Sequence, residues 1–191
     1  GVLDALAAAA SGRLGTERDP LFAANTLSEY LFDELRFRGN REDYYDPRNS
    51  FLNQVLARRQ GIPITLSLVY IEVGKRLGVP LLGVGMPGHF AVRHAEVDDL
   101  FIDPFHGGIL LSEQECVERV RQVTQANMPW DSRYLDPIGN REFIARIVRN
   151  LKGSYLRQQD YTRALTMINW LLELHPQATL ERRDRGLVHY H

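Results

Sequence analysis

A histidine and an aspartate in two neighbouring strand-like segments are the residues of this sequence best suited to chemistry. His89 lies in a Pro-Gly-His-Phe stretch, and Asp103 follows in an Ile-Asp-Pro-Phe stretch. A carboxylate beside an imidazole orients the ring, so that the imidazole can act as a general base. If the turn between the segments centres near Glu96, the two side chains become cross-strand neighbours. We therefore predict that His89 and Asp103 form a paired site.

The nucleophile that such a pair would activate is harder to find. Enzymes of the papain and transglutaminase type place a thiol at the N-terminus of a buried helix that precedes the histidine and the acid. The apolar helix expected here begins at Pro63, and its first turns offer the hydroxyls of Thr65 and Ser67. Small hydroxyls in a buried helix usually bond a preceding carbonyl. Cys116, the single cysteine, follows the sheet in a helix of its own and would need a different architecture to approach His89.

A metal site is the alternative use of these side chains. His89, His94, Asp103 and His106 could supply nitrogen and oxygen ligands for zinc or a similar ion. His89 and His94 are an odd number of residues apart, so they face opposite sides of a regular strand. We therefore expect no metal and no other cofactor, with His94 a solvated strand residue and His106 a turn residue near the site.

Three further residues are candidates for ligand binding. Tyr45 belongs to the acidic and aromatic loop at residues 42–46, which can form a contact surface or a packed connection. Asn53 and His106 complete the predicted binding set.

The elements that position these residues follow from turn and capping signals. Asp19 and Pro20 start a helix that we expect to end at Gly39, and a short helix after Ser50 is expected to end at Gly61. The segments LLGVGM, HFAVRH and LFIDPF predict an antiparallel meander. Ser112 with Glu115 forms a capping box for a helix extending to about residue 126.

The C-terminal segment has the spacing of a tetratricopeptide unit. The small side chain of Ala164 would let Tyr155 pack closely between two antiparallel helices, and Pro176 would end the pair. A further copy begins near Leu180. One repeat and a partial copy cannot form an extended groove, so we expect this tail to dock on the main domain.

A family resemblance is carried by two stretches, DPRNSFLNQVLARRQGIPITLSLVYIEVGKRLGVPLLGVGMPGHFAVRH and FIDPFHGG. They resemble the transglutaminase-like domain of the bacterial SirB-type family, which typically carries a tetratricopeptide tail; the resemblance covers about residues 20–190. It implies an α+β fold: a papain/transglutaminase-like core, in which a buried helix packs on a small antiparallel sheet, and a C-terminal helical hairpin. We place the core domain at residues 1–135 and the tail at 136–191, and the helical pattern at the end of the sequence leads us to expect a truncated tail.

The resemblance also implies site residues and one departure. His89 and Asp103 stand at the positions of the superfamily's catalytic histidine and aspartate. Active thiol enzymes of the superfamily have a cysteine in the first turn of the buried helix, and relatives that keep it have Gly-x-Cys where this chain has Gly61-Ile62-Pro63. Pro63 has no nucleophile.

Composition excludes several classes of function. With 23 Lys and Arg against 24 Asp and Glu, the chain has a formal charge of −1, which gives no net attraction to nucleic acid or anionic membranes. The basic clusters, among them Arg119 with Arg121, lie among acids and are predicted to be solvated helix faces. The single cysteine points to a reducing, cytoplasmic compartment.

Two functions remain open from the sequence. The first is a non-catalytic protein-binding or regulatory module with a protein or peptide partner, favoured because Pro63 replaces the thiol. The second is a hydrolase or acyltransferase that uses His89 and Asp103 with Ser67, Thr65 or a water molecule as nucleophile.

Overall fold

The computed structural model describes residues 1–17, 19–124 and 129–189. The helices are α1 (Val2–Leu14), α2 (Pro20–Ser28), α3 (Leu52–Arg58), α4 (Pro63–Arg76), α5 (Glu113–Thr124), α6 (Asn140–Arg157), α7 (Tyr161–Leu174) and α8 (Thr179–Val188). The strands are β1 (Arg38–Gly39), β2 (Gln60–Gly61), β3 (Leu81–Val84), β4 (Ala91–His94), β5 (Phe101–Asp103) and β6 (Ile109–Leu111). The predicted α+β class is confirmed. None of the described helices is long and apolar enough to cross a membrane.

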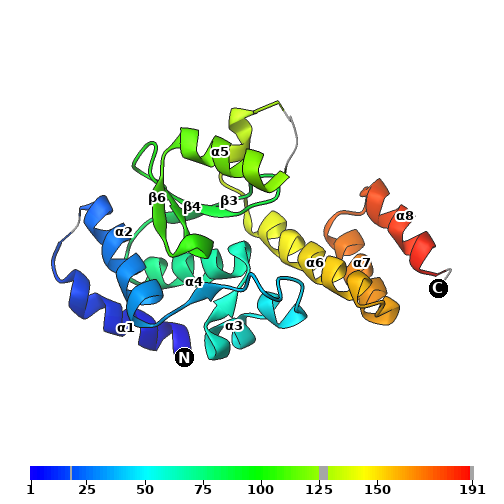
Figure 1. Cartoon of the computed structure of the whole chain (residues 1–191), viewed down its shortest axis with the longest axis horizontal. Helices are drawn as coiled ribbons and strands as arrows, with labels where there is room; N and C mark the ends of the chain where they lie inside the picture. The colour runs from blue at the N-terminus through cyan, green and yellow to red at the C-terminus, as the bar shows by residue number, and fades with distance from the viewer. Residues whose placement is uncertain (18, 125–128, 190–191) are drawn as a thin grey trace.

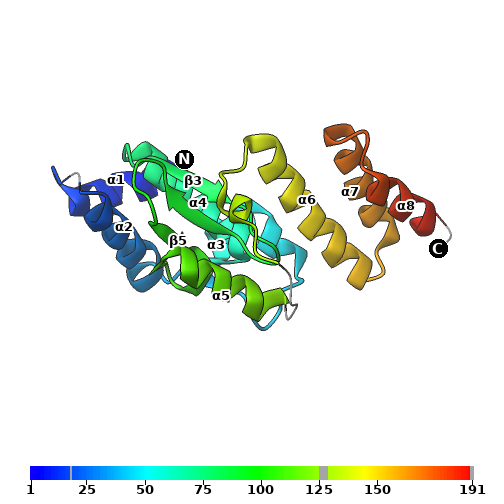
Figure 2. The same cartoon turned by 90° about the horizontal axis from the view of Figure 1, so that it is seen from above.

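The four strands β3 to β6 form an antiparallel meander between two helices. α4 lies on one face of the sheet and α5 on the other (Figures 1 and 2). Alternate residues of each strand face opposite layers, so Val92 and Ile102 join the core around α4, whereas Ala91 and Phe101 join the core around α5. The meander predicted from the sequence is therefore confirmed.

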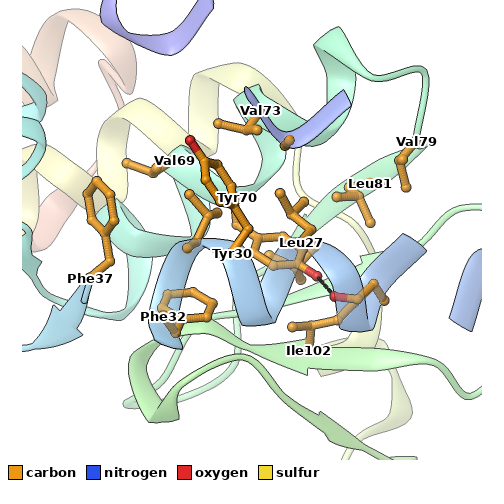
Figure 3. Close-up of a cluster of buried hydrophobic side chains, with 14 of the residues drawn as sticks. Leu27, Tyr30, Phe32, Phe37, Val69, Tyr70, Val73, Val79, Leu81 and Ile102 are labelled. Atoms are coloured by element: carbon orange, nitrogen blue, oxygen red, sulfur yellow. Dashed lines mark hydrogen bonds between the residues drawn. The ribbon is translucent and has the colours of Figure 1, made fainter. Parts of the chain in front are cut away.

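The larger core surrounds α4, which is apolar on most of its surface. Tyr70 is completely buried, and its hydroxyl donates a hydrogen bond to the carbonyl of Ala24 at 2.8 Å. Leu27 of α2, Val73 of α4 and Ile102 of β5 belong to the same cluster (Figure 3). This packing fixes α4 against the sheet and so fixes where its N-terminus lies.

The predicted helix end at Gly39 is wrong. α2 continues as a π-helix over residues 29–34, and the backbone then turns at Arg36, which has a φ of 61°. Gly39 instead belongs to β1, which pairs in parallel with β2. A Cβ at Gly39 would lie 2.5 Å from the ring of Phe105, so this glycine serves a close contact between distant segments.

The capping signal of α5 predicted its start correctly, unlike the signal taken from Gly39. The Ser112–Glu115 capping box is confirmed: the Ser112 backbone N–H donates to Glu115 Oε2 at 2.7 Å, and the Glu115 N–H donates to Ser112 Oγ at 3.3 Å. The helix that it caps is described to Thr124, and the predicted end near residue 126 lies outside the described residues.

α6 packs against the sheet and the residues that precede it. Phe143 of α6 packs against Phe90, with ring centroids 4.9 Å apart. The opposite face of α6 forms a second small core with α7, in which Tyr155 and Ala164 are buried as the repeat spacing predicted. α7 and α8 lie on the far side of α6 from the sheet (Figures 1 and 2), so only part of the tail docks as expected.

Candidate functional site

His89 and Asp103 meet at the end of the sheet. Strands β4 and β5 pair Val92 with Ile102, which centres their turn on Val97, one residue later than expected. His89 therefore lies two residues before β4, outside the ladder, and its Nε2 reaches Asp103 Oδ2 at 2.9 Å. Both side chains are almost completely buried. The pair predicted from the sequence is formed, although not by direct cross-strand pairing.

The Asp103 carboxylate is surrounded by donors. Oδ1 accepts the backbone N–H groups of Phe105 and His106 at 3.2 and 3.3 Å, because Asp103 caps the 3-10 turn Pro104–His106. Oδ2 accepts from His106 Nδ1 at 2.7 Å as well as from His89, and Arg119 Nε lies 3.4 Å away.

These contacts keep Asp103 ionised. Burial acts to raise the pKa of Asp103, but the hydrogen bonds from His106 and His89 outweigh it and hold the pKa well below its usual range. An ionised carboxylate accepts, so His89 donates through Nε2, and in the neutral ring the lone pair is then on Nδ1. No described residue forms a hydrogen bond with Nδ1. His89 is therefore a correctly oriented base without a partner.

Among the described residues, His89, Asp103 and His106 form the one cluster of side chains that could hold a metal ion. Ligand atoms of His89, Asp103 and His106 lie within 4.8 Å of one another. The two nitrogens are 2.9 and 2.7 Å from Oδ2, which matches hydrogen bonds, whereas ligands around zinc at ~2.1 Å stand about 3.3 Å apart. The Arg119 cation beside Oδ2 also opposes a metal ion. The geometry fits a hydrogen-bonded triad better than a metal centre.

His94 does not join this group. It is buried rather than solvated as predicted, and its Nδ1 accepts the backbone N–H of Glu96 at 3.2 Å. Burial lowers the pKa of His94.

Neither candidate hydroxyl of α4 reaches the triad. Thr65 Oγ1 accepts the N–H of Ile62 at 3.1 Å and donates to the carbonyl of Asn49 at 2.7 Å, so it ties the start of the helix to the preceding segment. Ser67 is fully buried, and its Oγ has no hydrogen-bond partner among the described residues. Neither residue lines the cavity in front of His89, whereas Pro63 and Ile64 do.

Cys116 is also unsuited to act as a nucleophile. Its side chain is fully buried in the core between α5 and the sheet. Burial, with the negative charge of Asp103 as the next contribution, raises the pKa of Cys116 to about 12. The thiol therefore stays protonated and closed off from the cavity at neutral pH.

His89 faces a cavity of about 670 Å³ that α6 closes on one side. Its walls come from the loop before α3, the N-terminus of α4, the end of the sheet, α5 and α6. The lining residues are Tyr44, Tyr45, Pro63, Ile64, Gly88, His89, Phe90, Phe105, His106, Arg119, Val123, Glu142, Arg146, Arg149 and Asn150.

Of the predicted binding residues, two lie at this cavity. Tyr45 and His106 are in its wall, and the Tyr45 hydroxyl accepts a hydrogen bond from Arg157 at 3.2 Å. Asn53 lies on the exposed face of α3 and does not line the cavity. The buried asparagine of this region is Asn49, whose amide nitrogen donates to the carbonyls of Asp43 and Tyr44 and so fixes the loop that presents Tyr45.

The sequence interpretation missed three arginines. Arg119 was expected on a solvated helix face, yet it lies over Asp103 with its side chain 19% exposed. Arg146 and Arg149 line the cavity from α6. The amphipathic period of α6 could not reveal this, because the helix buries two faces against two different partners.

The sequence comparisons agree with this architecture. The family model of the transglutaminase-like superfamily matches residues 1–149. The chain belongs to this superfamily. A tetratricopeptide repeat model matches residues 151–191 of the same transglutaminase-like chain.

Curated relatives of the transglutaminase-like chain include bacterial and mammalian proteins. It is 45% identical over 168 residues to a UPF0162 protein of Xylella fastidiosa (strain 9a5c), covering 85% of this chain and 59% of the relative. It is 31% identical over 175 residues to a UPF0162 protein of Vibrio cholerae, covering 91% and 64%. It is 32% identical over 164 residues to F-box only protein 21 of Homo sapiens, covering 80% and 25%. No solved structure matches the chain.

The chain spans about three fifths of the length of the bacterial relatives it matches. The SirB-type assignment made from the sequence is confirmed by these matches, which include several UPF0162 proteins.

Proposed function

We propose that this chain is a non-catalytic binding module that holds a peptide segment of a partner protein in the cavity in front of His89. The observation that carries the proposal is the pairing of an intact, open cavity with a proline at the nucleophile position. Pro63 lines the cavity and supplies no nucleophile, and the hydroxyls of Thr65 and Ser67 do not line it. A cavity of about 670 Å³ is within the size range of small-ligand sites and can take a few residues of a peptide.

The tail supports a protein partner. A tetratricopeptide unit is a helical repeat whose stacked copies form binding surfaces. The repeat match begins within α6, directly after the residues of that helix that line the cavity. We also propose that the chain divides into a core domain of residues 1–135 and a tail of residues 136–191. In this division α6 belongs to the tail and closes the cavity of the core domain. The cytoplasmic location remains a prediction.

The test is whether selected peptides lose their binding when the cavity is blocked. Peptides displayed on phage are selected on the full chain and then compared on Asn150→Trp, in which an indole fills the cavity from α6. Glu173→Trp, on an exposed position of α7, is the matched control. We expect selected peptides to lose binding to N150W and to keep binding to E173W. Peptides that bind N150W as well as the wild type, or no selectable peptide at all, would contradict the proposal.

A second candidate function is hydrolysis by a water molecule that His89 activates. The observation that favours it is the free Nδ1 of a histidine whose Nε2 is held by an ionised aspartate. Hydrolysis of nitrophenyl esters and peptide amides by the wild type, lost in His89→Ala of unchanged melting temperature, would support this candidate. Equal rates for wild type and His89→Ala would reject it.

A further inference from the structure

Arg146 is a cation in the cavity wall that forms no ion pair with any described carboxylate. Its Nη2 donates to the carbonyl of Met86 at 2.6 Å, and its guanidinium lies 5.6 Å from the centre of the Phe90 ring. No described carboxylate lies within ion-pair distance of it. The side chain is partly buried, and the loss of hydration lowers the pKa of Arg146. A partly buried charge of this kind gains free energy when an anion approaches it.

The other two arginines of the cavity already have acids. Arg149 donates to Glu142 at 2.6 Å, and Arg119 lies 3.4 Å from Asp103. Arg146 is therefore the described arginine of the wall that has no ion pair, and Glu142, which Arg149 holds, attracts it only from beyond ion-pair distance. Arg119 adds no free charge, because its buried Nε faces the Asp103 carboxylate.

The position of Arg146 is built into the fold. A Cβ at Gly85 would overlap Arg146 Nη1, so a glycine after β3 is required for the guanidinium to lie where it does. The carbonyl of Met86 and the ring of Phe90 then hold it from two sides. A guanidinium fixed in this way presents its remaining N–H groups in a planar fork that matches a carboxylate.

We propose that Arg146 binds a carboxylate of the peptide ligand, so that the cavity selects peptides with an acidic side chain or a free C-terminus beside His89. This inference rests on the proposed function. One cation without an ion pair balances one carboxylate, whereas a phosphate dianion would need a second such cation.

The test compares three short peptides on the full chain by NMR titration of backbone amides. The probes are N-acetyl-Ala-Glu-Ala-amide, its Gln counterpart, and N-acetyl-Ala-Ala-Ala with a free C-terminus; inorganic phosphate is a fourth. We expect the Glu peptide or the free-acid peptide to bind at least about tenfold more tightly than the Gln peptide, with shifts at residues around Phe90. The stronger of the two identifies the source of the carboxylate. Tighter binding of phosphate than of both acidic peptides would overturn the assignment.

Two variants complete the test. Arg146→Gln should abolish the preference for the acidic peptide, and Arg146→Lys, which keeps the charge without the fork, should retain part of it. Arg141→Gln removes the same charge from the exposed face of α6 outside the cavity and should change nothing. Equal binding of Glu and Gln peptides to the wild type would overturn this inference alone, whereas no binding of any peptide would overturn the proposed function as well.

Discussion

Asp103 holds a negative charge inside the protein because side-chain and backbone donors surround both of its oxygens. His89 and His106 meet one oxygen at 2.9 and 2.7 Å, and two backbone N–H groups meet the other. An amide in place of the carboxylate keeps one acceptor oxygen but turns an NH2 group toward the donors that met the other oxygen, which costs more than the net value of the bonds themselves. The residue is therefore important for stability whether or not the site performs catalysis.

Asp103→Asn should lower the free energy of unfolding at pH 7 by about 2–4 kcal/mol. Urea unfolding measures it, and Asp98→Asn, at an exposed position, is the control with the same change of charge. A loss no larger than that of the control would show that the triad is not formed in solution.

The contribution of the Asp103 carboxylate to stability should fall at acidic pH. The folded pKa of Asp103 is depressed, so its contribution to stability is fully present above the unfolded pKa of about 3.9 and is lost as the pH falls toward the folded pKa. The stability difference between wild type and Asp103→Asn should therefore shrink between about pH 5 and pH 2. A difference that stays constant over this window would contradict the depressed pKa.

Cys116 should be inert in the folded protein. Because burial raises its pKa to about 12, almost no thiolate exists at pH 8, and the side chain is closed to reagents. Iodoacetamide labelling followed by mass spectrometry should show slow modification of the native chain and rapid modification in urea. Fast labelling without denaturant would place the thiol at an accessible position instead.

The start of α4 is fixed by one hydroxyl, while another hydroxyl in the same helix contributes little. Thr65→Val removes the bonds to Ile62 and Asn49 and should cost about 1–3 kcal/mol of unfolding free energy. Ser67→Ala removes a buried Oγ that bonds no described residue, so it should be neutral or stabilising. Thermal unfolding of both variants gives the comparison, and an equal loss for both would refute these bonding assignments.

Elements were predictable where their signals are local. The proline at the start of α4, the capping box of α5 and the alternation of β3 to β5 each depend on residues within one or two turns. The failures came from long-range contacts: Gly39 serves a contact with Phe105, not a helix end, and His89 lies beyond the strand ladder. The pairing of His89 with Asp103 was inferred because their sequence contexts resemble a family pattern, which carries tertiary information that local propensity lacks.

At the scale of the whole molecule, α6 joins two cores and closes the cavity. Phe143 and Ile147 pack toward Phe90, while Ala145 and Leu151 pack toward α7. The sequence predicted the repeat but not this wall, because nothing in a helix period says which partner each face meets. The cationic residues of the cavity were missed for the same reason.

Phe143→Ala should loosen the tail from the core domain. It removes the edge contact with Phe90, and we expect a loss of about 2 kcal/mol of unfolding free energy together with faster amide hydrogen exchange in α6. Ile144→Ala, at the next and exposed position, is the matched control and should have little effect. Unchanged exchange in α6 for F143A would mean that the tail is held by other contacts.

The central claim is that the cavity keeps the arrangement of a transglutaminase-like site and lacks only its nucleophile. The most direct measurement is the rate at which iodoacetamide alkylates the thiol introduced by Pro63→Cys, with Ser67→Cys as a control deeper in the same helix. A thiol at the helix N-terminus beside His89 should have a lowered pKa and react far faster than the thiol of the S67C variant. Adding His89→Ala to the P63C variant should slow its alkylation at least about tenfold. A rate that matches that of the S67C variant, or that His89→Ala leaves unchanged, would contradict the claim.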